Sequence, residues 1–104
     1  MEVELHPDAA SELLALPPAE QTARLNAIAK LEAIGPTLGF PHTSQVQGAE
    51  VRELRARAGR SPWRAFYRQV GQVLRIGAIG PEAAVKPRLF QAAIKRAVER
   101  LKDW

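Results

Sequence analysis

Arginine is the residue type in this sequence whose spacing most suggests chemistry. In the second half of the chain, Arg55 and Arg57 are two residues apart, and Arg64 and Arg68 lie on either side of Phe66. Side chains two apart on a strand share one face. Guanidinium groups bind phosphates in a fork geometry, and aromatic rings stack on unpaired bases. This spacing predicts an RNA-binding sheet surface.

The pairing register decides which side chains face solvent, because a shift of one residue exchanges the two faces of a strand. Trp63, Ala65 and Tyr67 share the face opposite to Arg64, so Tyr67 is either a core ring or a residue at the site. Arginines on adjacent antiparallel strands lie close together, which is unfavourable unless an anion joins them. A second interpretation is that these arginines only keep edge strands soluble.

Other chemistries have weaker support. The chain contains no cysteine and no glycine-rich phosphate loop, and two histidines are too few for an ordinary histidine-based metal site, so no metal or other cofactor is expected. His42 could act as a general base, although a single loop histidine is more often simply solvated. His6 precedes a proline, and a local structural role is expected for it.

Charge is unevenly distributed along the 104 residues. The formal net charge is +4, but residues 1–48 carry −4 and residues 49–104 carry +8. A strongly basic half is typical of a surface that binds phosphate or another anionic partner. We therefore expect an acidic partner segment to cover the basic sheet.

The hydrophobic pattern predicts strands and helices in a definite order. EVEL at 2–5 alternates as a strand does, a helix opens at Pro7 with Asp8 as its expected cap, and a second helix runs from Pro18 to the Gly35-Pro36 stop. Residues 35–48 are expected to form a loop. The predicted later elements are strands at 51–57, 63–70 and 72–79 and a helix that starts at Pro87.

Together these elements predict an α+β fold in a single domain spanning 1–104, in the order β-α-α-β-β-β-α. The sheet is expected to be small and antiparallel, with the helices packed mainly on one face and the other face free. The acidic N-terminus lacks an apolar signal region, and no apolar run reaches membrane-spanning length. A cytoplasmic protein without membrane contact is expected.

The second half of the sequence resembles the RelE/HigB toxins of type II toxin–antitoxin systems, especially the branch related to phage Gp49-like proteins. The resemblance rests on the order and spacing of four short motifs, which are Glu53-Leu54-Arg55, Trp63-Arg64-Ala65-Phe66-Tyr67, the strand from Leu74 to Gly77, and the helix alanines Ala92, Ala93 and Ala97. The element order matches that family over nearly the whole chain.

This resemblance implies a metal-independent endoribonuclease that cleaves mRNA on the translating ribosome and is held in check by an antitoxin, expected to be of the helix-turn-helix type. The RNA's own 2′-hydroxyl attacks the adjacent phosphate, and the protein supplies positive charge and proton transfer. The predicted catalytic residues are Arg55, Arg64, Tyr67 and Lys86. The predicted RNA-binding residues are Arg52, Arg57, Arg68, Arg75 and Arg88.

The sequence departs from the family where a lysine pair usually follows the third strand, because that place reads Gly80-Pro81-Glu82. Glu82 would either repel the phosphate or accept the proton of the 2′-hydroxyl. Repulsion is favoured, because Pro81 is expected to turn Glu82 outward into solvent, with Lys86 or Arg88 as the compensating cation. The departure keeps two alternatives open: a ParE-like toxin that inhibits DNA gyrase, and a nucleic-acid-binding module without catalysis.

Overall fold

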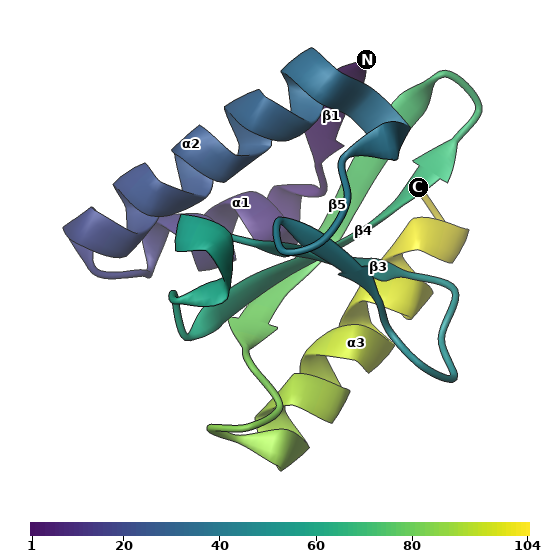
Figure 1. Cartoon of the computed structure of the whole chain (residues 1–104). Coiled ribbons are helices and arrows are strands. Elements are labelled where there is room, and N and C mark those ends of the chain that lie inside the picture. Colours follow the sequence, from purple (N-terminus) through teal and green to yellow (C-terminus); the bar gives the residue numbers. More distant parts are fainter.

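A computed structural model covers residues 1–104 and has the predicted α+β architecture (Figure 1). The strands are β1 (Glu2–Leu5), β2 (Thr43–Gln45), β3 (Arg52–Arg55), β4 (Trp63–Val70) and β5 (Val73–Pro81); the helices are α1 (Pro7–Leu14), α2 (Pro18–Ile34) and α3 (Pro87–Lys102), with short 3₁₀ turns η1 (Gly35–Thr37) and η2 (Arg57–Gly59). The predicted element order is confirmed, with the addition of β2, which lies in the segment expected to be a loop.

The five strands form one mixed sheet in the order β1-β5-β4-β3-β2. β3, β4 and β5 are antiparallel neighbours joined by short connections, as expected, and β2 pairs antiparallel with β3. β1 instead runs parallel to β5. Most of the chain separates these two strands, so no hairpin turn forces them to be antiparallel.

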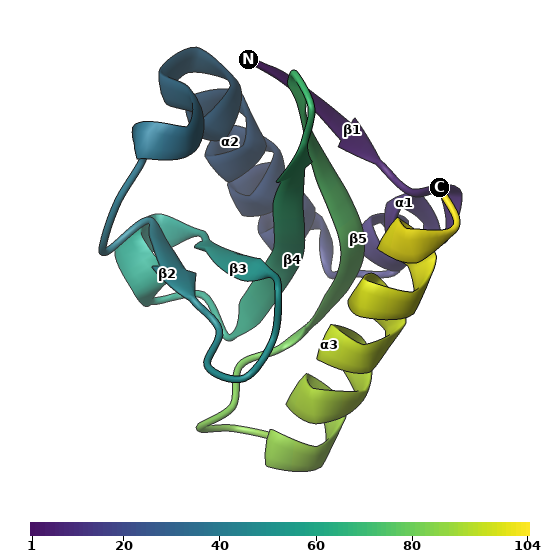
Figure 2. The ribbon, with the colours of Figure 1, turned by 90° about the vertical axis from the view of Figure 1, so that its right-hand side faces the viewer.

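Helices cover both faces of the sheet: α1 and α2 lie together on one face, and α3 lies on the other (Figure 2). The larger core cluster joins Leu13, Ile28 and Leu31 of the first two helices to Leu54, Tyr67 and Ile76 of the sheet. The smaller cluster joins Phe90, Ile94 and Leu101 of α3 to Phe66 and Ala78. The face expected to be free is therefore partly covered by α3.

A glycine allows α3 to approach the sheet closely. Gly77 lies at an irregularity in the β4–β5 pairing, where Phe66 pairs with Ala78 and the next residue, Tyr67, pairs with Ile76. A Cβ atom at Gly77 would lie 2.8 Å from the backbone oxygen of Ala97 in α3. Any larger residue would force helix and strand apart.

The predicted alternation along β4 is confirmed. Ala65 and Tyr67 face α1 and α2, whereas Phe66 and its neighbours Arg64 and Arg68 face the α3 side.

At the start of α1, His6 rather than Asp8 is the N-cap residue, and its Nδ1 accepts a hydrogen bond from the backbone N–H of Asp8 at 3.0 Å. None of the helices combines the length and the apolar run that crossing a membrane requires.

Candidate functional site

Acidic residues of the N-terminal half form ion pairs with part of the basic C-terminal half. The ion pairs that join the two halves are Glu4–Arg75 at 3.1 Å, Asp8–Arg100 at 3.9 Å, Glu12–Arg100 at 3.0 Å, Glu12–Arg96 at 3.3 Å and Glu20–Arg57 at 2.7 Å. Four of the 13 cations in residues 49–104 are thus paired with carboxylates of the first half. Fewer cations are free for an external anion than the charge of +8 in residues 49–104 suggests.

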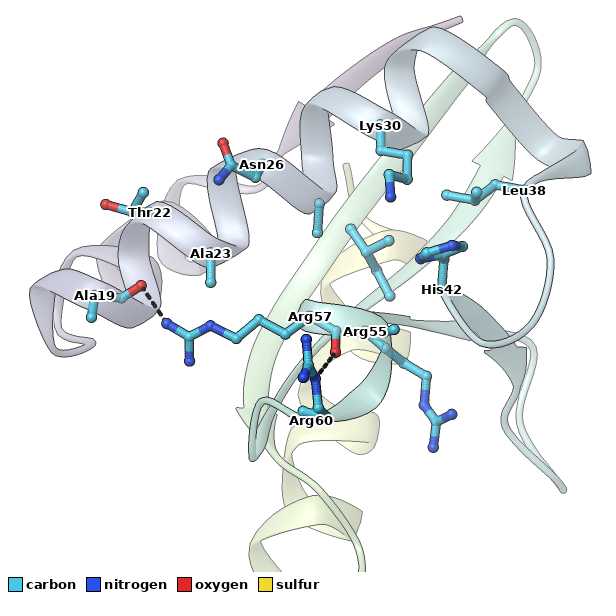
Figure 3. Close-up of a pocket in the computed structure, with 13 residues that line it drawn as sticks. Ala19, Thr22, Ala23, Asn26, Lys30, Leu38, His42, Arg55, Arg57 and Arg60 are labelled. Carbon is cyan, nitrogen blue, oxygen red and sulfur yellow. Dashed lines mark hydrogen bonds between the residues drawn. The ribbon is translucent and has the colours of Figure 1, made fainter.

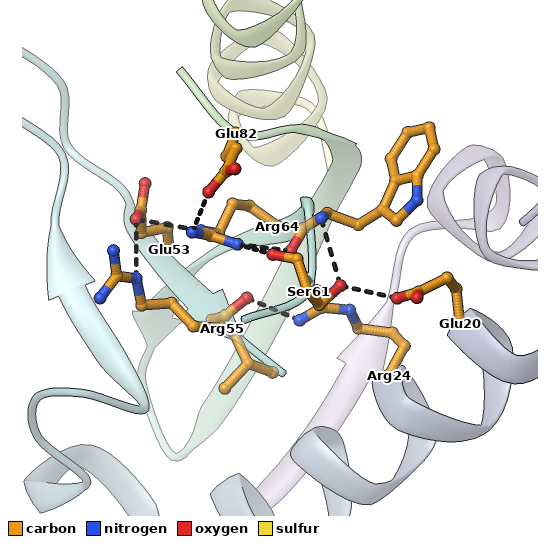
Figure 4. A network of polar contacts seen from close by, with 9 residues as sticks. Glu20, Arg24, Glu53, Arg55, Ser61, Arg64 and Glu82 are labelled. Atoms are coloured by element: carbon orange, nitrogen blue, oxygen red, sulfur yellow. Dashed lines mark hydrogen bonds and ion pairs between the residues drawn. The ribbon is translucent and has the colours of Figure 1, made fainter. Parts of the chain in front are cut away.

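Arg64 lies inside the protein, in the network of Figure 4, and its side chain is only 2% exposed. Its Nη2 donates to Glu82 at 2.6 Å, its Nε donates to Glu53 at 3.3 Å, and its Nη1 donates to the backbone oxygens of Ser61 and Trp63. The expectation that Glu82 points outward is wrong, because the buried guanidinium attracts its carboxylate inward. Removing one member of such a buried pair leaves the other charge uncompensated.

A second buried arginine, Arg24 of α2, lies beside this network (Figure 4). Its guanidinium donates to the backbone oxygens of Leu54 at 2.6 Å and Trp63 at 2.7 Å, so it joins α2 to both β3 and β4. Burial and the nearby charge of Arg64 lower the pKa of Arg24 to about 10, against the opposite influence of Glu20. Arg24 therefore remains protonated near neutral pH.

Arg55 and Arg64 face each other directly across β3 and β4. Two positive charges this close repel each other unless an anion lies between them. The protein supplies that anion itself, because Glu53 Oε1 lies 3.3 Å from the Nε atom of each arginine. The two arginines differ in access to solvent. The Arg55 side chain is 22% exposed and has no other carboxylate partner, whereas Arg64 is enclosed.

Arg68 and Arg75 form a second cross-strand pair, which is met by the carboxylates of Glu50 and Glu4 and by backbone oxygens in and just after the last turn of α3. Arg68 donates to the backbone oxygen of Leu101 at 3.0 Å, and Arg75 donates to that of Trp104 at 2.8 Å while lying over the Trp104 ring. The carbonyl groups at a helix C-terminus carry partial negative charge. Both arginines thus hold the end of α3 against the sheet.

The remaining predicted site residues are spread over the surface and the core. Tyr67 is 2% exposed and packs in the core beneath α1 and α2. Lys86 and Arg88 are exposed at the start of α3, without an ion-pair partner, and Arg52 donates to Thr43 Oγ1 at 3.0 Å. The structure does not gather the predicted catalytic set, Arg55, Arg64, Tyr67 and Lys86, around one open cavity.

An open basic groove lies between α2 and the segment formed by β3 and η2 (Figure 3). Its volume is about 400 Å³. The residues that line it are Ala19, Thr22, Ala23, Asn26, Ala27 and Lys30 from α2, Leu38 and His42 from the following loop, and Leu54, Arg55, Arg57, Ala58 and Arg60 from the opposite wall. Four of these side chains carry a positive charge, and no carboxylate is among them. We call this cavity the basic groove.

The basic wall of the groove is shaped by a tight turn. Arg57, Ala58 and Gly59 all have positive φ angles, of 51°, 53° and 91°. Such a conformation is costly for residues other than glycine and persists where the surroundings hold it. Here Arg57 bonds to Glu20 of α2, and the absence of a side chain at Gly59 leaves room for the Arg55 guanidinium to lie against the turn.

Glu20 is the anchor of this turn. Its carboxylate accepts hydrogen bonds from Ser61 Oγ and from Arg57 Nη1, each at 2.7 Å. These contacts, with that from Ser61 the stronger, lower the pKa of Glu20 below its ordinary value. Arg57 is therefore partly neutralised, whereas Lys30 and Arg60 have no carboxylate partner and present their charge to the groove.

His42 lies in the groove beside these cations, in a half-buried position. Its backbone is held from both sides, since its N–H donates to Gly39 O at 3.0 Å and its carbonyl accepts from the Arg55 N–H at 2.8 Å. The sequence drew attention to His42 only as a possible base. Its proximity to Arg55 depends on strand pairing, and short-range patterns do not reveal it.

The fold is thus of the α+β class, and its open groove is lined by four cationic side chains and by no carboxylate. The particular family is given by sequence comparison: the chain belongs to the family described as Phage derived protein Gp49-like (DUF891), which matches residues 11–72. This segment includes every residue that lines the basic groove. The family is toxin-like, which implies an antitoxin partner in general.

Searches of curated proteins and of solved structures found no match. No group of three or more histidine or carboxylate side chains comes together in a way that could hold a metal ion.

Proposed function

We propose that this protein is the toxin of a toxin–antitoxin pair and that it cleaves RNA in the basic groove. The observation that carries the proposal is the meeting of Lys30, Arg55 and Arg60 with His42 in one open groove without a carboxylate. Such a groove attracts a phosphate backbone, and the histidine adds a group able to move a proton. Both features lie within the segment that matches the toxin-like family.

The reaction proposed is attack of the RNA 2′-oxygen on the neighbouring phosphorus. His42 accepts the proton of the 2′-hydroxyl as the new bond to phosphorus forms. The bond from phosphorus to the 5′-oxygen then breaks, and that oxygen takes a proton from water in the open groove. The hydroxide that remains takes the proton held by His42, which returns the histidine to its neutral form. The products are a 2′,3′-cyclic phosphate and a free 5′-hydroxyl.

The cations have separate tasks in this proposal. Arg55 and Arg60 stabilise the negative charge that builds up on the phosphate oxygens, a type of contribution that is commonly worth a factor of roughly 10²–10³ in rate. Lys30 binds the flanking phosphate on the side of α2. Arg57 contributes less to phosphate binding, because its ion pair with Glu20 partly neutralises its positive charge.

The other residues suggested by the resemblance receive different roles. Arg64 is a positioning residue, because it holds Glu53, which in turn contacts the Arg55 guanidinium. Tyr67 supports the core beneath β4. Arg68 and Arg75 fix the C-terminal end of α3. Arg52, Lys86 and Arg88 lie outside the groove and would contact RNA only beyond the cleaved nucleotide.

Two partners complete the proposal. Following the resemblance to RelE/HigB toxins, the substrate is mRNA on the translating ribosome. The antitoxin is of the helix-turn-helix type and carries an acidic segment that occupies the basic groove in place of RNA. Charge-steered association weakens as salt rises. A toxin–antitoxin complex that leaves Lys30 and Arg60 uncovered would contradict this second part.

Induced expression of the chain, with translation, mRNA integrity and DNA supercoiling measured separately, tests the function. We expect rapid arrest of translation with cut mRNA, and loss of both effects in His42→Ala and in Arg55→Ala. Lys95→Ala, on the exposed surface of α3, is the control and should remain toxic. Arrest with DNA damage and intact mRNA would favour the gyrase alternative, and absence of any effect would favour a binding module.

A further inference from the structure

We infer that Phe40 forms a stacking platform for an unpaired nucleobase at the mouth of the basic groove. The substrate would then have to be single-stranded at the nucleotide bound there. This inference rests on the proposed function, because it adds a base-binding position beside the phosphate-binding cations.

Phe40 is the most exposed large apolar side chain of the protein, at 78%. It lies between Leu38 and His42, and both of these residues line the groove. An aromatic ring so exposed gains nothing from the hydrophobic core, so its apolar surface is available to a ligand.

The Phe40 ring already has a cationic neighbour. The guanidinium carbon of Arg55 lies 5.4 Å from the ring centroid, within the range of a cation–π contact. In Figure 3 the Arg55 side chain points away from α2, towards the outer rim of the groove. An aromatic face and a guanidinium group side by side offer both partners that a nucleotide needs, one for the base and one for its phosphate.

The segment that carries Phe40 is anchored at both ends. Leu38 is buried, and its backbone oxygen accepts a hydrogen bond from the buried Thr43 Oγ1. The backbone N–H groups of His42 and Thr43 both donate to Gly39 O, at 3.0 and 3.2 Å. Because the backbone on either side is already ordered, binding a base there costs less conformational entropy than ordering a free loop.

The surroundings of Phe40 favour a nucleobase over a protein partner. A protein contact site normally presents a contiguous apolar patch. The Phe40 ring instead contacts the Arg55 guanidinium, and the groove beside it contains Lys30, His42 and Arg60 together with smaller apolar positions such as Leu38. Most of the other exposed large apolar side chains, such as Leu14 and Leu89, belong to α1, α2 and α3. A single ring among cations suits a base attached to phosphate.

Binding of a fluorescent single-stranded oligoadenylate RNA, and of an RNA duplex of equal length, tests the inference. All variants carry His42→Ala so that RNA is not cut. Phe40→Ala should weaken single-strand binding by roughly 5- to 150-fold, the range measured for loss of one base–aromatic stack, and should change duplex affinity less than about twofold. Phe40→Leu should behave like Phe40→Ala, and Phe40→Trp should retain affinity, with its indole fluorescence quenched on binding.

Leu14→Ala is the matched control, because Leu14 is 71% exposed and does not line the groove. If Phe40→Ala binds single strands normally while Arg60→Ala does not, the platform is wrong and the proposed function stands. Full affinity of Phe40→Leu for single-stranded RNA would likewise overturn the platform, because an apolar contact would then be enough. So would a Phe40→Ala variant that loses affinity for the antitoxin but not for RNA. If the protein that carries only His42→Ala binds no RNA, both proposals fail.

Discussion

The arginine network around Arg64 and the basic groove meet at β3, and both take their positive charge mainly from arginine. They differ in the carboxylates that pair with those arginines. Arg64 meets two carboxylates, Glu53 and Glu82, and is 2% exposed. Arg60, four residues earlier, is exposed and meets only a backbone carbonyl, at 3.1 Å. The spacing of arginines along the chain is similar in both regions. Whether an arginine is free to bind a ligand is therefore decided by which carboxylates the fold places beside it.

Replacing Arg64 gives the largest expected effect and tests whether the buried arginine stabilises the fold more than an exposed one does. Arg64→Ala leaves the partly buried Glu82 without its ion-pair partner and leaves Glu53 with Arg55 alone. We therefore expect a loss of about 3–5 kcal/mol in the free energy of unfolding. Urea denaturation measures it. Arg60→Ala is the control and should change stability by less than about 0.5 kcal/mol. Equal, small effects in both variants would show that Arg64 is no more structural than a surface arginine.

The next largest effect is expected from His42. His42→Ala should lower the rate of RNA cleavage by roughly 10²–10⁴-fold, the usual contribution of a general base. Affinity for an RNA with a 2′-deoxy group at the cleavage point should stay within about twofold. If affinity falls as much as rate, His42 only binds RNA and proton transfer belongs to another group.

Salt titration sharpens the contrast between free and paired arginines. Arg60→Ala should reduce the slope of log affinity for RNA against log salt concentration by about 1, because one phosphate contact is lost. Arg75, which is paired with Glu4 and with the end of α3, serves as the paired counterpart. An equal change of slope in Arg75→Ala would mean that internal pairing does not remove an arginine from the binding surface.

The smallest effect is expected at Glu20, which holds the turn that forms the groove wall. Its lowered pKa means that the ionised form stabilises the fold above about pH 4.5, and that this contribution is lost as pH falls through the folded pKa. Glu20→Gln should thus cost on the order of 0.5–1 kcal/mol at pH 7. Urea denaturation at several pH values should show the difference closing in acid. A pH-independent difference would contradict the ion-pair explanation.

Much of the fold follows from local patterns in the sequence. The alternation of Ala65, Phe66 and Tyr67 predicts the two faces of β4, and Pro87 predicts the start of α3. The face on which α3 packs could not be predicted, because an apolar stripe shows that a helix is buried but not against which side of a sheet. The close fit of Gly77 to Ala97 becomes visible only in three dimensions.

The candidate site was harder to predict, for electrostatic reasons. Arg64 and Glu82 are 18 residues apart and meet only because β4 and β5 pair. The prediction from sequence therefore treated Arg64 as a free cation and Glu82 as a solvent-exposed residue. His42 and Arg60, by contrast, come together through strand pairing and the η2 turn, and neither belongs to a recognisable motif.

The most direct test of the central claim, that RNA binds in the basic groove and not on the sheet face, is to map binding by the chemical shifts of backbone amides. We predict that a single-stranded RNA shifts the amide signals of Lys30, residues 38–40, His42 and residues 55–60, and leaves those of Arg68, Arg75 and the end of α3 unchanged. Shifts confined to Arg68, Arg75 and α3, with the groove signals unmoved, would contradict the account.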